Sequence, residues 1–321
     1  MALPINVPDL LRSSSKINAE REQPLRIVIV VEPDAPDELI DAVRDRFRPN
    51  TSNARLQIEV AEADVRVPLR DTSDAVIAVV GSGRSGIAAT LAEARDRAIP
   101  ALAVGLAGNL RDVAEYAAHP YADTVAELDA ARVIDDEVSA WLVERLSGKR
   151  LALAHNFPFM RKAVADEAVK ATALQNALIG TVVIIPGADM PLMTLNQAKM
   201  LLQIAAAYGQ RLGTERIKEL GAVVGGGFAL RAVARQLLVF VPGFGWAVKG
   251  AIAYGGTIAM GKAAVSYFEE GFDLAEIAGK LVEVRDAAVE RIRRDKHVLR
   301  HTAAELAEAR DARADDEPSE L

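Results

Sequence analysis

The residues best suited to bind a charged ligand are glycines between an apolar run and a helical pattern. Gly81, Gly83 and Gly86 form a G-x-G-x-x-G motif after the apolar run 75–80, with Ser85 in the same turn. Backbone N–H groups in such a turn can bind a dinucleotide pyrophosphate or another anion. However, the motif does not follow the first predicted strand, and no acidic residue ends the next one to bind a ribose hydroxyl. The four residues are therefore a weak ligand-binding candidate, and a tight turn is the simpler interpretation.

The same turn lacks two residues of a P-loop. Gly81 and Gly86 have the spacing of G-x-x-x-x-G-K-[ST], but Ile87 and Ala88 occupy the positions of the phosphate-binding lysine and the magnesium-binding hydroxyl. The turn after the first predicted strand, residues 32–37, contains no glycine or lysine, and its carboxylates would repel phosphate. We therefore interpret the chain as lacking a nucleotide site.

Other sets of catalytic or metal-binding residues are also incomplete. Gly-Leu-Ala-Gly at 105–108 stands where a GTPase has N-K-x-D, and the chain contains no cysteine. His297 and His301 share a helix face, but basic residues surround them and no third ligand is evident. We therefore expect a non-enzymatic protein with no metal and no cofactor. The alternative is a nucleotide-responsive protein that uses Gly81–Gly86 as an atypical phosphate loop.

The first half of the chain alternates between apolar runs and helical patterns. This alternation predicts the α/β class with a doubly wound parallel sheet, whose strand ends would position any ligand. Strands are predicted at 25–31, 55–61, 75–80 and 101–104, and helices at 36–47, 87–97, 110–117 and 124–143. Thr124 and Glu127 have the spacing of a capping box at the last of these helices.

The second half is rich in alanine and glycine and predicts an all-α domain. Helices are expected at 161–178, 195–212, 215–224 and 246–268, and a long charged helix at 273–314. Thr194 and Gln197 would cap the second of these. The expected organisation is a flexible tail at 1–23, an α/β domain at 24–148, an apolar helical domain at 149–272, and a charged helix with a disordered tail at 273–321.

Small residues recur four apart in the last apolar helix, at Ala247, Ala251, Gly255, Ala259 and Ala263, and Gly221 and Gly225 repeat the spacing. Such residues let helices approach closely, in a membrane pair or in a water-soluble bundle. Four polar residues, Asn176, Asp189, Arg231 and Arg235, stand among the apolar ones. They would be functional in a membrane and would otherwise satisfy backbone groups or ion pairs. The apolar stretches 174–193 and 236–261 are interrupted, which favours burial or partial insertion over a simple span.

The composition of the chain argues against a nucleic-acid partner. The net charge of −7 and the pI of about 5.3 are unlike those of nucleic-acid-binding domains. The N-terminal residues show no secretory signal, so a cytoplasmic protein is expected.

The stretch from Phe157 to Phe268 resembles the YcjF-type domain, a bacterial family of unknown function found behind Era-like GTPase domains. The resemblance rests on residues 157–161, 173–177, 186–189, 196–200, 204–209 and 235–268. It implies a GTPase-like first domain and contact with a membrane, and no activity. We therefore expect an interaction or scaffold protein at the inner face of the cell membrane, with a protein partner or self-association. The further alternative is a soluble homo-oligomer.

Overall fold

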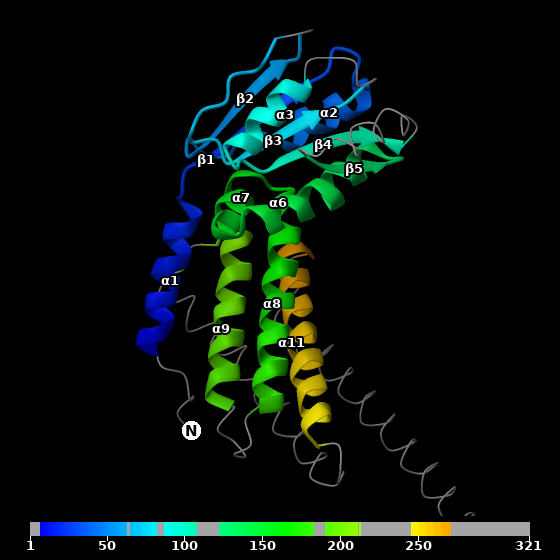
Figure 1. The fold of residues 1–321 in the computed structure, drawn as a ribbon. Coiled ribbons are helices and arrows are strands. Elements are labelled where there is room, and N and C mark those ends of the chain that lie inside the picture. The colour runs from blue at the N-terminus through cyan, green and yellow to red at the C-terminus, as the bar shows by residue number, and fades with distance from the viewer. Residues whose placement is uncertain are drawn as a thin grey trace, which may run out of the picture. The chain divides into compact units, whose positions relative to one another are not determined.

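The computed structural model describes residues 7–62, 65–81, 87–107, 122–182, 190–210, 212 and 245–270. Its central feature is a sheet of five parallel strands in the order β2-β1-β3-β4-β5 (Figure 1). The strands are β1 (Leu25–Val31), β2 (Ala54–Val60), β3 (Ala75–Val79), β4 (Ala101–Leu106) and β5 (Asp123–Glu127). The predicted parallel sheet is confirmed, and the four predicted strands are found within one or two residues of their expected bounds.

Helices flank the sheet and continue away from it (Figure 1). They are α1 (Val7–Arg21), α2 (Asp37–Arg46), α3 (Ile87–Asp96), α5 (Ala130–Arg132), the π-helical turn η2 (Val133–Val138), α6 (Ser139–Arg145), the 3-10 turn η3 (Ser147–Lys149), α7 (Arg150–Asn156), α8 (Met160–Val182), α9 (Met190–Ala207) and α11 (Gly245–Glu270). These elements belong to one compact unit, Met1–Glu269.

Alternate residues of the strands face two hydrophobic clusters, one on each side of the sheet. In β1, Ile27 and Ile29 pack in the cluster that contains α2, η2 and α6, whereas Val28 and Val30 pack in the cluster that contains α3. A strand that is buried on both faces needs apolar residues at successive positions, which the sequence of β1 provides.

Strand β5 corrects one sequence prediction. Residues 123–127 pair in parallel with β4 instead of starting a helix, so Thr124 is not a helix cap. The helical segment begins later, at Ala130, where the Asp129 carboxylate accepts a hydrogen bond of 2.8 Å from the backbone N–H of Arg132. The prediction was wrong because the capping-box spacing also fits a short strand whose pairing depends on residues far along the chain.

Helix α1 lies within the segment that we expected to be a flexible tail. Leu10 and Ile17, seven residues apart, are buried on one face of α1, which contacts α7 and α9. The serine hydroxyls bond within the helix, and Ser14 donates to the carbonyl of Leu11 at 2.8 Å. Arg21 donates to the carbonyl of Gln210 at 2.9 Å. The tail prediction failed because two apolar residues among serines are enough to dock a helix on an existing apolar surface.

The long helices of the second half are found where helices were predicted, with different bounds. Helix α8 extends the helix predicted at 161–178, and α11 contains the one predicted at 246–268. Helix α9 begins at Met190, so Thr194 lies inside it and is not its cap. Pro191, in the first turn, marks this start, since a proline there loses no helical hydrogen bond. The helices predicted at 110–117, 215–224 and 273–314 lie outside the described residues.

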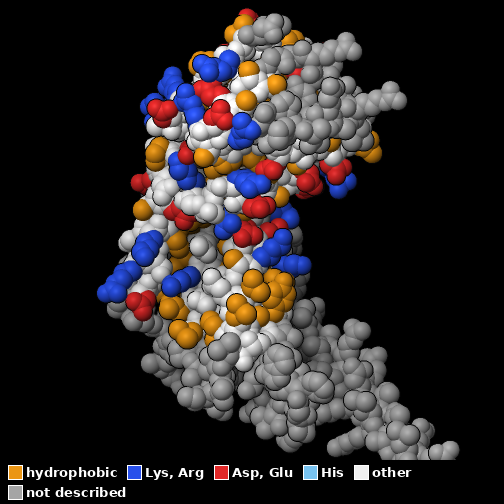
Figure 2. Space-filling view, in the orientation of Figure 1, with side chains coloured by type: hydrophobic (Ala, Val, Ile, Leu, Met, Phe, Trp, Pro, Cys, Tyr) orange, Lys and Arg blue, Asp and Glu red, His pale blue; other side chains and the backbone are white. Residues whose placement is uncertain are grey.

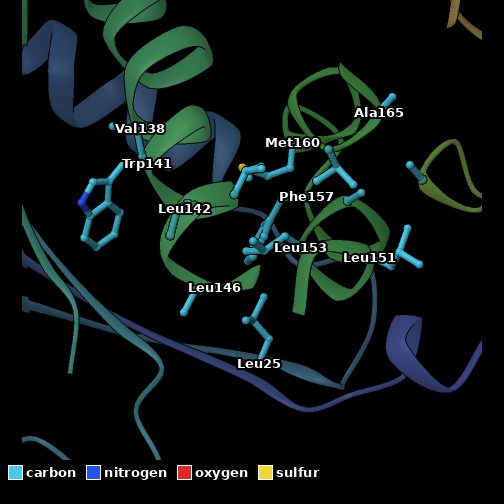
Figure 3. Packing of buried hydrophobic residues seen from close by; sticks show 14 of the residues in the cluster. Leu25, Val138, Trp141, Leu142, Leu146, Leu151, Leu153, Phe157, Met160 and Ala165 are labelled. Atoms are coloured by element: carbon cyan, nitrogen blue, oxygen red, sulfur yellow. The ribbon is translucent and has the colours of Figure 1, made fainter. Parts of the chain in front are cut away.

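One hydrophobic cluster joins the sheet to the helices. Figure 3 shows Phe157 among Leu142, Leu153, Met160 and Leu25, which come from α6, α7, α8 and β1. All five side chains are fully buried.

Hydrogen bonds and an ion pair reinforce this junction. The Lys149 ammonium donates to the Asp74 carboxylate at 2.6 Å and to the carbonyl of Pro24 at 2.7 Å. The Thr51 hydroxyl donates to the side-chain oxygen of Asn156, itself buried at the end of α7, at 2.7 Å. The amino-terminal edge of the sheet is therefore anchored to η3 and α7 by partly buried polar groups.

Candidate functional site

The crevice between β1 and β3 is the place where a doubly wound sheet ordinarily binds a ligand. The chain leaves β1 toward β2 on one side and leaves β3 toward β4 on the other, so their carboxyl ends form a topological switch point. Here the fully buried carboxylate of Glu32 accepts a hydrogen bond of 2.7 Å from the backbone N–H of Gly81. A Cβ on Gly81 would lie 2.5 Å from the backbone carbon and oxygen of Asp34.

The chain itself therefore occupies this position. The Gly81 N–H, which a phosphate loop would offer to an anion, is already bonded to an acid. The glycine is needed because the backbone of Asp34 approaches so closely, which agrees with the tight-turn interpretation. The other members of the motif, Gly83, Ser85 and Gly86, lie outside the described residues.

A buried polar network joins α8, α9 and α11. The side-chain amide of Asn176 donates to the hydroxyl of Thr257 at 3.0 Å, and that of Gln197 donates to the same hydroxyl at 3.1 Å. Asn196 donates to the side-chain oxygen of Asn176 at 3.2 Å, and Thr257 donates to the carbonyl of Ala253 at 2.7 Å. Asn176, Gln197 and Thr257 are at most 2% exposed.

Of this network, sequence reasoning found only Asn176. Its partners carried a weaker signal, as single polar residues in apolar helical patterns. Asp189, Arg231 and Arg235, the other polar candidates of the apolar domain, lie outside the described residues.

Helix α11 lies close to α8 at two glycines that the sequence analysis did not select. A Cβ on Gly261 would overlap the side chain of Val169, and one on Gly250 would lie 2.7 Å from a methyl carbon of Thr181. By contrast, Gly255 of the predicted small-residue stripe is exposed, and a Cβ there would meet open space.

The other stripe members do not change this result. Ala259 and Ala263 are half-buried, the side chains of Ala247 and Ala251 are not described, and Gly221 and Gly225 lie outside the described residues. The contact face of α11 against α8 is instead the one that carries Gly250, Thr257 and Gly261.

The parts of these helices around the polar network contain no charged residue, although Lys249 precedes this part of α11 at its end away from the sheet. Residues 171–182 of α8, 190–198 of α9 and 250–261 of α11 lack Asp, Glu, Lys and Arg, and we call these three segments together the uncharged end. The polar network and the Gly250 contact place them side by side. Four of their large apolar side chains are exposed: Leu174 (58%), Leu178 (57%), Leu192 (53%) and Tyr254 (43%).

Figure 2 agrees with this distribution. On the face shown, acidic and basic side chains are spread over the sheet and the adjoining parts of the helices, and hydrophobic side chains gather further along the helices. The uncharged end thus combines internal hydrogen bonding with an apolar exterior.

A charged cleft lies nearer the sheet, between η2–α6 and α8. It has a volume of about 460 Å³, and its lining includes Asp135, Asp136, Glu144, Arg150, Lys162, Asp166 and Glu167. Ion pairs cross or border it, with Arg150 3.3 Å from Glu167 and Lys162 3.1 Å from Asp166. The hydrogen bond from Lys162 to Asp166 raises the pKa of that ammonium group. Since opposite charges already pair along it, we interpret the cleft as a solvated ion-pair network.

Tyr208 and His155, near the sheet side of the helices, have shifted pKa values. Burial, followed by the hydrogen bond from its hydroxyl to Glu269 at 2.7 Å, raises the pKa of Tyr208. Burial and then the charge of Arg21 lower the pKa of His155, whose ring nitrogen lies 3.1 Å from the Arg21 guanidinium. Both shifts have structural causes, and neither group lines the charged cleft.

Two other kinds of site are absent from the described residues. No group of three or more His, Cys, Asp or Glu side chains could hold a metal ion there. No helix in this part of the chain has the length and apolarity needed to cross a membrane. His297 and His301 lie outside it.

Comparison with known proteins adds no identification. No protein-family model matches the chain, and no curated protein matches it.

Proposed function

We propose that this protein is a non-catalytic scaffold that attaches by its helices to a membrane surface, at the inner face of the cell membrane. The observation that carries the proposal is the uncharged end, where Leu174, Leu178 and Leu192 are exposed while Asn176 and Thr257 are bonded inside. A lipid environment demands this arrangement, because polar groups in hydrocarbon must find partners within the protein. Partial insertion of the uncharged end would remove the exposed leucines from water.

In this proposal, the sheet belongs to a GTPase-like domain that lacks a P-loop and has lost its nucleotide site. An Ala/Gly-rich helical domain and a charged C-terminal helix follow it in the chain. The support is the switch point, where the Glu32 carboxylate bonds the Gly81 N–H and the backbone of Asp34 closes on the glycine. A phosphate there would have to displace a buried carboxylate of the same charge.

Calorimetric titration of the full chain with GTP, ATP and NAD, each with magnesium, is therefore expected to give no heat of binding. The physical reason is that the Gly81 N–H already has an anionic acceptor. Saturable heat with any of the three would contradict the loss of the nucleotide site and would favour the alternative of a nucleotide-responsive protein.

Replacing Leu178 by glutamate is expected to abolish membrane attachment without unfolding the protein. The side chain is 57% exposed, so a charge there is tolerated in water, whereas a charge within hydrocarbon costs about 2–4 kcal/mol. The measurement is flotation of the purified full chain with vesicles made from a total bacterial lipid extract. We expect the Leu178→Glu variant to bind at least about 30-fold more weakly than the unchanged protein.

The matched control is Leu128→Glu, which adds the same charge at a position that is 82% exposed and directly follows β5. Equal loss of flotation in both variants, or none in either, would contradict attachment through the uncharged end. Light scattering tests the remaining alternative, a soluble homo-oligomer. An oligomer in lipid-free solution that Gly255→Leu dissociates would favour self-association, since Gly255 faces open space on α11.

A further inference from the structure

Five basic side chains surround the helices on the sheet side of the uncharged end. They are Arg12 and Lys16 of α1, Lys170 of α8, Lys199 of α9 and Lys262 of α11, and we call them the cationic girdle. Lys170, Lys199 and Lys262 border the three uncharged segments on the sheet side, and Lys249 borders the α11 segment on the other side.

The girdle residues lie at similar heights along the helices. The polar network sets a common level, because Asn176, Gln197 and Thr257 meet there. At 1.5 Å of rise per residue, Lys170 lies about 9 Å, Lys262 about 8 Å and Lys199 about 3 Å to the sheet side of that level.

Helix α1 brings its two basic residues to the same region. It runs beside α9, and Arg21 at its sheet end bonds the carbonyl of Gln210 just beyond α9. Arg12 is nine residues from Arg21, or about 14 Å, and Lys199 is eight residues from the end of α9, or about 12 Å. All five girdle residues therefore lie in one band of the helices.

The charges of the girdle are available to a partner. Lys16, Lys170 and Lys262 are exposed and Lys199 is half-buried, and none of these four has an ion-pair partner in the described part of the chain. Arg12 is 81% exposed and lies 3.6 Å from Asp9. The neighbouring acids Asp166 and Glu167 are bound by Lys162 and Arg150.

The acidic side chains of the charged cleft are placed differently. Asp135, Asp136 and Glu144 belong to η2 and α6, nearer the sheet than the girdle, of which only Lys170 reaches the lining of the cleft. A negatively charged surface would therefore attract the girdle and repel the cleft, which favours approach of the uncharged end first. The net charge of −7 would by itself repel a negatively charged surface. The basic residues next to the uncharged end offset this repulsion locally, because most of the acids of the cleft lie further from that end.

We infer that the cationic girdle binds the headgroups of anionic lipids, so that the protein selects negatively charged membranes when its uncharged end inserts. This inference rests on the proposed membrane attachment and names the lipid class that the attachment requires. Each basic residue near such a surface strengthens binding about fivefold, and salt screens the effect.

The test is flotation of the full chain with vesicles of phosphatidylcholine alone and with vesicles that also contain phosphatidylglycerol. We expect binding to the anionic vesicles to exceed binding to the neutral ones by at least about 100-fold and to weaken as salt is raised. The double variant K170Q/K262Q is expected to lose about 20-fold in binding to the anionic vesicles and nothing in binding to the neutral ones. The control R44Q/R95Q removes the same charge from α2 and α3 and should bind like the unchanged protein.

Equal binding to both kinds of vesicle, or an unchanged K170Q/K262Q variant, would overturn the selection of anionic lipid and leave membrane attachment intact. Binding to neither kind of vesicle would overturn membrane attachment itself, and the lipid selection with it. Equal losses in K170Q/K262Q and R44Q/R95Q would show that only the net charge matters and would also overturn the role of the girdle.

Discussion

An alanine in place of Gly261 is expected to lower the free energy of unfolding by about 1–3 kcal/mol, despite its better helix propensity. The added methyl would overlap Val169, which is 3% exposed and branched at Cβ, so it has little freedom to move aside. Helix α11 would have to withdraw from α8 along its contact face. Chemical denaturation of the full chain, followed by circular dichroism, measures the change.

Gly255→Ala is the matched control on the same helix. Its methyl would meet open space, so only the gain in helix propensity remains, and the free energy of unfolding should rise by up to about 1 kcal/mol. If Gly255→Ala lowered the free energy of unfolding more than Gly261→Ala, α11 would have to contact α8 through the small-residue stripe.

Thr257→Val should lower the free energy of unfolding by about 2–4 kcal/mol, although the two side chains have nearly the same shape. The substitution removes the hydroxyl that accepts from both Asn176 and Gln197, which leaves two buried N–H groups without that acceptor. Thr181→Val is the control, because the Thr181 hydroxyl bonds only the carbonyl of Leu178 at an exposed position. Its effect should stay within about 0.5 kcal/mol.

A triple variant separates hydrogen bonding from packing. Replacing Asn176 and Gln197 by leucine together with Thr257→Val removes both donors to Thr257 and their shared acceptor at once, so much of the lost stability should return, apart from the hydrogen bond that Asn196 donates to Asn176. If the triple variant were less stable than Thr257→Val alone, the three side chains would stabilise the fold mainly by their packing. Our account, in which their hydrogen bonds matter most, would then be wrong.

The parts of the fold that could be predicted are those with strong local signals. Strand β3 is a continuous apolar run and so is β1 from Ile27 on, and a central parallel strand suits β-branched residues that are buried on both faces. Strand β5 could not be recognised, because Asp-Thr-Val-Ala-Glu is short and only pairing with β4 stabilises it. Helix α1 likewise depends on a surface of α7 and α9 that forms from distant residues.

The candidate site was predictable only in part, for a geometric reason. Residues four apart in an α-helix drift by about 40° per step, so the stripe from Ala247 to Ala263 turns by about 160° and cannot stay on one contact face. The real face follows Gly250, Thr257 and Gly261. Asn176 could be selected as a polar residue in an apolar helix. Its partners could not, because they depend on which faces of α8, α9 and α11 meet, and no local sequence pattern indicates those faces.

The shared cluster around Phe157 also has a mechanical meaning. Because side chains from β1, α6, α7 and α8 interlock there without an intervening linker, the sheet and the helices should tumble in solution as one rotor. On a membrane, the sheet would then keep a constant tilt and a constant distance from the lipid surface. A molecule bound to the sheet would be presented at a set height, unlike one that is carried on a flexible tether.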